Sequence, residues 1–164
     1  MPEHMYIGKD FEFFSANSLL TDDVTGKRRL SEVELSALLA ACIQKQKLLS
    51  EQNISYYLTI PPAKQTIYSE RLPDYLLLQL HGKKMAEQFK ESMNEAKTDF
   101  YVDVIDVLKY RHSKFPEERL FYQYDIHWSE WGAFLAYQTL MTTLSKKHDW
   151  IKAPLTLDEI RIDT

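Results

Sequence analysis

The sequence predicts an α/β domain built on a parallel sheet. Two short segments, 54–60 and 100–104, are rich in β-branched and aromatic residues, and Pro61 and Pro62 stop the first of them. Segments with apolar residues at helical spacing precede each one. This helix–strand–helix–strand order implies parallel strands joined by right-handed crossovers. With 164 residues, 45% of them hydrophobic, we expect one domain spanning 1–164.

The first third of the chain predicts an extended segment, a loop and a long helix. Residues 6–14 are aromatic-rich and favour a strand or a strand–turn–strand. Turn-forming Asn, Asp and Gly residues at 15–30 indicate an exposed loop. Ser31 and Glu34 have the spacing of a capping box, and apolar residues recur at helical spacing from there to about Asn53.

The rest of the chain predicts further helices around the second strand. Residues 72–80 favour one or two helical turns, and 83–97 a longer helix. One turn is expected at 105–110, followed by a polar loop at 111–119. Ser129 is typical of an N-cap, and it precedes a helix whose apolar residues would face the core.

Composition and charge exclude several classes of protein. A net charge of −4 without a basic stripe argues against a nucleic-acid partner. The single Cys42 excludes an internal disulfide and a cysteine-rich zinc site. No run of residues is apolar enough to span a bilayer, and no secretory signal is visible. We therefore expect either a cytosolic protein or one whose leader has been removed.

The candidate chemistry lies in the segment before the last helix. In an extended segment, residues two apart face the same side, so Asp125 and His127 can share a cleft. A carboxylate beside an imidazole fixes its tautomer and favours the imidazolium that forms when it takes a proton. The pair would supply two thirds of a nucleophilic triad. The alternative is a solvated or structural pair of the kind that often occurs by chance.

A second candidate stretch follows the first predicted strand. Open parallel sheets bind ligands just beyond the carboxyl ends of their strands. Lys64 could meet an anionic group there, and Tyr68 could stack or donate a hydrogen bond; the alternative is a strand stop with a solvated lysine. Tyr122 and Tyr124 could form a wall for stacking a sugar, or could simply pack in the core.

These features occur together in an order that resembles one family. The order is Gly8-Lys9-Asp10, then Pro61-Pro62-Ala63-Lys64 with Tyr68, then Leu72-Pro73, and finally Asp125-Ile126-His127-Trp128. In this order of motifs the sequence is similar to the alginate O-acetyltransferase-like group of the SGNH-hydrolase-like superfamily, whose members carry an Asp-x-His-Trp motif. The similarity runs over nearly the whole chain, although only that motif is specific.

The resemblance implies a fold, an activity and a location. The fold would be an SGNH-hydrolase-like, three-layer α/β sandwich with a parallel sheet. The activity would be transfer of acetyl groups to hydroxyls of an extracytoplasmic polysaccharide by a Ser-His-Asp mechanism without a cofactor, the acetyl group being handed over by a membrane acyltransferase. His127 would be the base and Asp125 its orienting acid, and Trp128 would join Lys64, Tyr68 and Tyr124 as substrate contacts.

The sequence departs from the family pattern at the nucleophile. In this group the serine lies in a Gly-Asp-Ser motif downstream of the Asp-x-His-Trp motif, but none of the four glycines here precedes Asp-Ser. Ser129 lies two residues after His127, yet its cap role and the family pattern argue against it. We therefore expect the domain to be incomplete at its C-terminus and inactive alone, with an exposed sheet edge that favours self-association.

The enzyme would be a carbohydrate O-acetyltransferase or an acetylesterase, and two further hypotheses remain beside it. One is a non-catalytic carbohydrate-binding or assembly module that has kept the fold without the nucleophile. The other is a metal site in which Asp125 and His127 join another histidine. No second ligand lies at a spacing typical of metal sites, so this hypothesis is the weakest.

Overall fold

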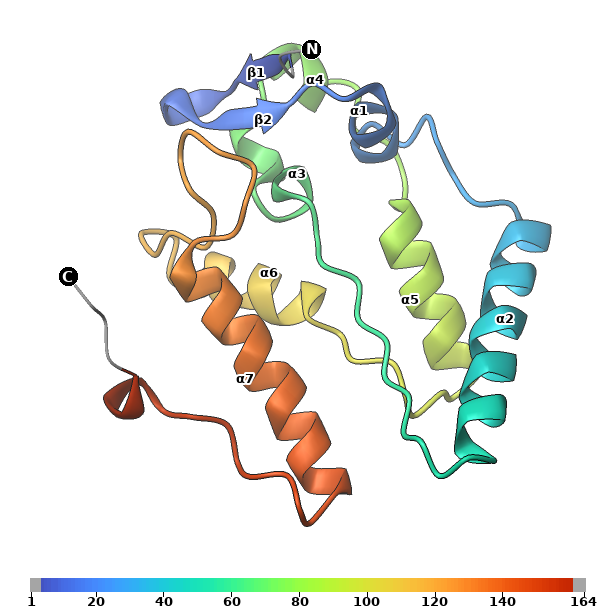
Figure 1. Ribbon diagram of the computed structural model, residues 1–164. Helices are drawn as coiled ribbons and strands as arrows, with labels where there is room; N and C mark the ends of the chain where they lie inside the picture. The colour runs from blue at the N-terminus through green and yellow to red at the C-terminus, as the bar shows by residue number, and fades with distance from the viewer. Residues whose placement is uncertain (1–3, 161–164) are drawn as a thin grey trace.

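The computed structural model describes residues 4–160, in which helices predominate (Figure 1). Short 3₁₀ turns occur at Lys9–Phe11, Ser69–Arg71 and Leu157–Glu159. The strands are β1 (Met5–Ile7) and β2 (Phe13–Ser15), and the α-helices are α1 (Ser18–Val24), α2 (Glu32–Ser50), α3 (Lys64–Ile67), α4 (Asp74–Leu77), α5 (Met85–Glu95), α6 (Ile105–Lys114) and α7 (Glu130–Lys147).

The hairpin β1–β2 matches the expected strand–turn–strand near the N-terminus. Its strands are antiparallel, with Tyr6 opposite Phe14 in the middle of the ladder. The turn contains left-handed backbone at Asp10, where φ is 54°. Gly8 precedes it, and a Cβ atom at Gly8 would collide with the carbonyl oxygen of Arg71. The close approach to Arg71 therefore requires glycine at this position.

The long helix α2 begins at the predicted capping box. The Ser31 side chain accepts the Glu34 N–H, and the Glu34 carboxylate accepts the Ser31 N–H. The helix packs beside α5, with Leu35 and Leu39 partly buried against a cluster around the buried Met93. Its remaining surface leaves several apolar side chains exposed, namely Val33, Leu38, Ile43 and Leu48.

The predicted parallel three-layer sandwich is not confirmed by the described residues, in which the parallel pairing is short. Segments 54–60 and 100–104 do run parallel, but a single bridge, Leu58 to Tyr101, joins them. The N–H of Leu58 donates to the carbonyl of Phe100, and Leu58 accepts in turn from Val102. Within residues 4–160 the only sheet is the antiparallel pair β1–β2. A pair of short strands without further neighbours is only marginally stable, because a sheet needs three or more strands for independent stability. The hydrogen-bond ladder between these two segments is therefore short.

Two predicted loops are partly helical. The segment 15–30 contains α1, because the Asn17 side chain accepts the N–H of Leu19 and caps the helix. The helix expected at 105–110 continues to Lys114. Asp103 starts it by accepting N–H groups of the first turn. At Asn17 a short polar side chain that indicated a turn acts as a helix cap.

The main core lies where the hairpin, α3 and the segment before α7 meet, at one end of the molecule (Figure 1). The large buried side chains there include Phe14, Tyr68, Leu72 and Phe121. Helices α6 and α7 pack together below this core. No helix in the described part of the chain combines the length and apolar content needed to cross a bilayer.

Candidate functional site

Asp125 and His127 form a close pair on the surface of the loop that precedes α7. Asp125 Oδ1 lies 2.6 Å from His127 Nδ1, and their side chains are 52% and 76% exposed. The hydrogen bond from His127 is the main cause that lowers the pKa of the Asp125 carboxyl below its ordinary value, and backbone N–H donors add to it. The expected contact is therefore present, with the imidazole open to solvent.

The pair is held in a turn rather than in the extended segment that the spacing suggested. Asp125 Oδ1 also accepts the backbone N–H groups of Ile126 and His127, which wraps the loop around the carboxylate. An antiparallel bridge between Phe121 and Trp128 closes the loop. The imidazole Nδ1 faces Asp125, and among residues 4–160 nothing hydrogen-bonds to Nε2. Nε2 is thus available to accept a proton.

Ser129 caps α7 and is not poised to act as a nucleophile. Its hydroxyl donates to the carbonyl of Arg119 at 2.5 Å and accepts the N–H of Gly132 at 3.1 Å. The residue is only 7% exposed. A Cβ atom at Gly132 would collide with the carbonyl of Leu120, so the helix start lies against the beginning of the loop. The predicted N-cap is confirmed, and it fixes the base of the loop.

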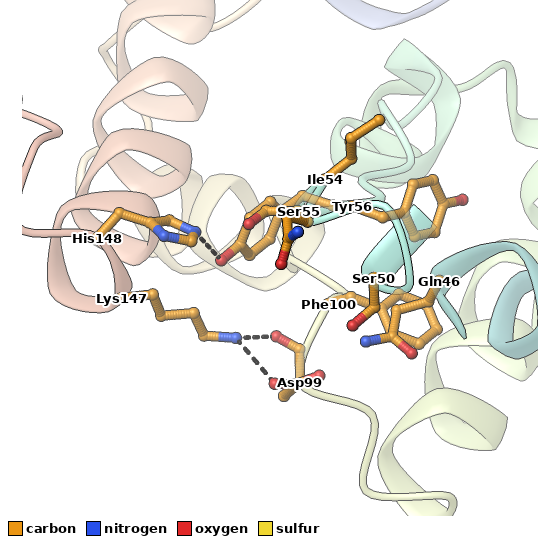
Figure 2. A pocket seen from close by; sticks show the side chains of 11 residues that line it. Gln46, Ser50, Ile54, Ser55, Tyr56, Asp99, Phe100, Lys147 and His148 are labelled. Carbon is orange, nitrogen blue, oxygen red and sulfur yellow. Dashed lines mark hydrogen bonds and ion pairs between the residues drawn. The ribbon is translucent and has the colours of Figure 1, made fainter. Parts of the chain in front are cut away.

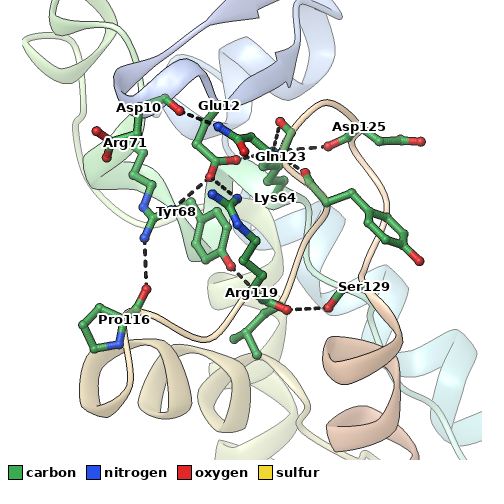
Figure 3. A network of polar contacts seen from close by, with 12 residues as sticks. Asp10, Glu12, Lys64, Tyr68, Arg71, Pro116, Arg119, Gln123, Asp125 and Ser129 are labelled. Atoms are coloured by element: carbon green, nitrogen blue, oxygen red, sulfur yellow. Dashed lines mark hydrogen bonds and ion pairs between the residues drawn. The ribbon is translucent and has the colours of Figure 1, made fainter. Parts of the chain in front are cut away.

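Lys64 supports the same loop from beneath (Figure 3). Its side chain is fully buried, and its ammonium donates to the carbonyls of Tyr122, Gln123 and Asp125 at 2.7, 3.0 and 3.2 Å. Burial lowers the pKa of Lys64, and the Glu12 carboxylate opposes this shift. The predicted substrate contact needs revision, because this ammonium meets an internal anion and the loop backbone instead of an open cleft.

Glu12 is the anion that Lys64 meets, and it binds three cations. Its fully buried carboxylate lies 2.7 Å from Lys64 Nζ, 3.0 Å from Arg71 Nη1 and 2.9 Å from Arg119 Nη1. Figure 3 shows these side chains converging from the hairpin, α3, the 3₁₀ turn that ends at Arg71 and the segment before the loop. A buried charge is tolerated when it is paired and hydrogen-bonded, as Glu12 is here.

Tyr68 is also enclosed rather than exposed to a ligand. Its hydroxyl accepts the N–H of Leu120 at 2.8 Å, and Arg71 lies over its ring at 4.7 Å from the centroid. Burial raises the pKa of the Tyr68 hydroxyl. The predicted stacking on a substrate therefore needs revision too: Tyr68 anchors the start of the loop from within the core.

The other aromatic candidates differ in exposure. Tyr124 is 67% exposed beside the Asp125–His127 pair and packs edge-to-face on Phe13 at 5.4 Å between centroids. The Tyr122 hydroxyl donates to Glu130 at 2.5 Å. Trp128 is partly buried against the main core, and its indole N–H points to the carbonyl of Pro62 at 3.4 Å. Of the four predicted substrate contacts, Tyr124 has the most accessible ring.

Two cavities bear on the choice of site. One of about 470 Å³ lies behind the loop, between Tyr122, Glu130 and Phe134. Another of about 540 Å³ lies near the other end of α7, where Tyr57 pairs with His148 at 2.8 Å (Figure 2). That second cavity is separated from the Asp125–His127 pair by the length of an 18-residue helix, roughly 27 Å. Only the first adjoins the loop.

The metal hypothesis finds no support in the described residues. Between 4 and 160, no group of three His, Cys, Asp or Glu side chains is arranged to hold an ion. His112 is bound to Glu70 and His148 to Tyr57, each by one ring nitrogen. Asp125 and His127 therefore stand as a pair without a third ligand from these histidines.

Sequence reasoning missed the residues that support the loop. Glu12, Arg71 and Arg119 drew no attention, because their positions in the sequence give no sign that they meet. The motif order did contain a signal. The backbone carbonyl of Asp10 in the Gly-Lys-Asp motif accepts the side-chain N–H of Gln123 at 2.7 Å, so this motif contacts the loop directly.

Comparison with known proteins agrees with this architecture. The sequence model of a family described as SGNH hydrolase-like domain, acetyltransferase AlgX, matches residues 7–158. No curated protein gives a match at the sequence level. Two solved structures are similar: PatB1 of Bacillus cereus with a sulfonyl adduct (TM-score 0.59, 21% identity, 77% of this chain and 42% of that one) and the O-acetyltransferase domain of Pseudomonas putida AlgJ (0.57, 21%, 87% and 48%).

Both solved structures are longer than this chain. The chain spans less than half of either solved structure, 42% of PatB1 and 48% of the AlgJ domain. At 21% identity the likeness concerns the fold, which is SGNH hydrolase-like.

Proposed function

This chain belongs to the family of SGNH hydrolase-like domains described as acetyltransferase AlgX, and on that premise we propose that it supplies the base of an acetyl-transfer site for polysaccharide hydroxyls. The observation that carries the proposal is the pair of Asp125 and His127. The carboxylate holds one ring nitrogen at 2.6 Å, and the other nitrogen faces solvent on an anchored loop. This is the arrangement that general-base activation of a hydroxyl requires.

In the proposed reaction, His127 Nε2 removes the proton of a serine hydroxyl as the serine oxygen attacks the acetyl carbonyl. Asp125 holds Nδ1–H and stabilises the imidazolium that results. The proton then passes to the leaving group, and an acetyl-serine remains. A polysaccharide hydroxyl attacks this ester and gives its proton to His127, and the imidazolium returns the proton to the serine oxygen as the bond from that oxygen to the acetyl carbon breaks. Donors that stabilise the oxyanion are also needed.

The serine would come from a polypeptide segment outside the described residues. Ser129 is committed to the helix cap, and no glycine in the sequence precedes Asp-Ser. The same segment would add strands beside 54–60 and 100–104 and so complete the parallel three-layer sandwich. Self-association through that edge is the alternative way of covering it. The exposed apolar side chains of α2 likewise favour burial, either against the additional segment or against a second copy of the chain.

By the same reasoning we place the protein outside the cytoplasm, where polysaccharides are acetylated, with the acetyl group delivered by a membrane acyltransferase. The family and the fold of the O-acetyltransferase domain of AlgJ support this placement. Tyr124 is the residue that we propose for stacking on a sugar, because its ring is exposed beside the base.

The test is substitution of the base in the intact natural protein. His127→Ala should abolish most release of acetate from an acetyl-ester reporter such as 4-nitrophenyl acetate, and His81→Ala, at an exposed position away from the loop, should not. Near-normal turnover by His127→Ala would refute the assignment of the base.

A non-catalytic carbohydrate-binding module is the second candidate, because the chain lacks the Gly-Asp-Ser motif. It predicts that the intact protein releases no acetate but binds a polysaccharide, and that Tyr124→Ala weakens the binding. Calorimetric titration beside the turnover assay distinguishes the two candidates.

A further inference from the structure

The deepest charged group under the loop is the ammonium of Lys64. It is enclosed by four oxygens, three from the backbone of the loop at 122, 123 and 125 and one from Glu12 at 2.7 Å. The side chain has no exposed surface. Asp125 contributes both a carbonyl to this ammonium and a carboxylate to His127, so one residue joins the buried charge to the surface pair.

We infer that Lys64 is a positioning residue that sets the geometry of the Asp125–His127 pair by holding the backbone of the loop that carries it. The geometric part of this inference stands by itself. Its catalytic consequence rests on the proposed function, because only an acid–base role gives the imidazole orientation a kinetic effect.

The chemistry of the ammonium suits this task. Lysine carries three N–H donors on a compact charge, and buried backbone carbonyls without a donor are costly. The carbonyl of Gln123 also accepts the N–H of Phe13, but among residues 4–160 the ammonium is the only hydrogen-bond donor to the carbonyls of Tyr122 and Asp125. Methionine at position 64 would fill much of the same volume and leave the carbonyls of Tyr122 and Asp125 unpaired, while that of Gln123 keeps the N–H of Phe13 at 2.8 Å.

Glu12 would keep two of its three cations if Lys64 were replaced. The carboxylate keeps Arg71 at 3.0 Å and Arg119 at 2.9 Å when the ammonium is removed. Both guanidinium groups contact Oε1, so a substitution of Lys64 leaves the charge of Glu12 paired, while Oε2 loses its contact with the ammonium. The carbonyls of 122 and 125 lose their hydrogen-bond donor at the same time, so we expect the loop at 122–127 to relax.

A purely structural lysine would act differently. It would lower the free energy of unfolding without changing the state of His127 in the folded protein. A positioning lysine also changes the folded state, because a relaxed loop no longer keeps the Asp125 carboxylate against Nδ1. The tautomer of the neutral imidazole reports this, since Nδ1 carries the proton when Asp125 accepts from it.

The experiment compares Lys64→Met with Lys90→Met. Lys90 is a matched control, because it is also largely buried and paired with carboxylates, at 3.2 Å from Asp103 and 2.6 Å from Asp106, but lies away from the loop. Two-dimensional ¹H–¹⁵N correlation spectra of the imidazole, recorded where His127 is neutral, give the tautomer directly. The turnover of an acetyl-ester reporter by the intact protein gives the kinetic effect.

We expect the Nδ1–H tautomer in the wild type and in Lys90→Met, and its loss in folded Lys64→Met. The kcat should fall by about 10²-fold in Lys64→Met, the size of effect that a misplaced base produces, with little change in KM. A folded Lys64→Met protein that keeps the Nδ1–H tautomer overturns the inference. If Lys64→Met loses the Nδ1–H tautomer but even the wild-type intact protein shows no turnover, the positioning role of Lys64 is supported and the proposed function is refuted.

A second measurement covers the case in which Lys64→Met does not fold. In the wild-type protein, scalar couplings across hydrogen bonds between the Lys64 ¹⁵Nζ and the carbonyl ¹³C atoms of 122, 123 and 125 report the contacts without any substitution. Their presence supports the inference. Their absence, under conditions in which the ammonium protons exchange slowly enough to be seen, contradicts it.

Discussion

Asp125 holds Nδ1 of His127 at 2.6 Å while most of the imidazole remains exposed to solvent. The pair thus combines an oriented ring with an open second nitrogen, and this combination is the basis of the functional proposal. Its orientation comes from the loop and from what lies beneath it, so predictions can be made for each of these supports.

The first prediction concerns the acid that orients the base. Asp125→Asn should lower turnover of the acetyl-ester reporter by the intact protein by about 10²- to 10⁴-fold, because an amide does not hold the imidazole in the required tautomer. Circular dichroism should show an unchanged fold, since the side chain is largely exposed. If turnover stays within a factor of two, Asp125 does not orient the base.

The same carboxyl predicts a pH dependence of stability. Its pKa is lowered in the folded state, mainly by the hydrogen bond from His127, so it contributes stability above its unfolded pKa of roughly 3.9 that is lost as pH falls through the folded value. Thermal melting at pH 6 and pH 3 should therefore show a smaller difference for Asp125→Asn than for the wild type. Equal differences for the two proteins would contradict the assignment.

Ser129 provides a test that separates a cap from a nucleophile. Ser129→Ala should lower the free energy of unfolding by about 1 kcal/mol through loss of the N-cap, and leave the chemical step in place. Urea titration measures the first effect and ester turnover the second. Abolished turnover with unchanged stability would instead make Ser129 the nucleophile.

Position 132 should need glycine because a neighbouring backbone segment lies too close for a Cβ atom, and not because of its own backbone angles. Gly132→Ala improves helix propensity by about 1 kcal/mol, but its Cβ would meet the carbonyl of Leu120, which is backbone and cannot move aside easily. The variant should therefore be less stable than the wild type by chemical denaturation. Ala133→Gly, the reverse change at the exposed neighbouring position, is the control and should cost only the propensity difference.

Glu12 should be far more important for stability than an exposed acid. Glu12→Gln removes the charge shared by Lys64, Arg71 and Arg119 inside the protein, and we expect a loss of about 3 kcal/mol. Glu91→Gln breaks the exposed pair with Lys83 and should cost about 0.5 kcal/mol or less. Equal losses in urea titration would show that the buried cluster is not a stabilising centre.

Local features were predictable from the sequence because their cause is local. The caps at Ser31 and Ser129 depend on residues three apart, and the sequence predicted both. The contact between Asp125 and His127 also needed only neighbouring residues, although a turn and not an extended segment brings them together. Asn17 shows the limit: its side chain signals a turn or a helix start equally well.

Features that depend on distant segments were not predictable. The parallel orientation of 54–60 and 100–104 followed from the order of elements, but the extent of their ladder depends on which strands lie beside them. Lys64 was noticed for its place after a strand and was expected to face a ligand. Its actual partner Glu12 lies 52 residues earlier (64 − 12), and nothing local indicates that the two meet.

The sharing of Glu12 among three cations also bears on the route by which the chain folds. Arg119 and Glu12 are 107 residues apart, and Arg71 and Glu12 are 59 apart, so closing this cluster requires contacts of high sequence separation that form slowly. The Asp125–His127 pair gains its buried support only when the segments around residues 12, 64, 71 and 119 have come together. If the proposed function holds, recovery of acetyl-ester turnover by the refolding intact protein would lag behind the appearance of helical signal.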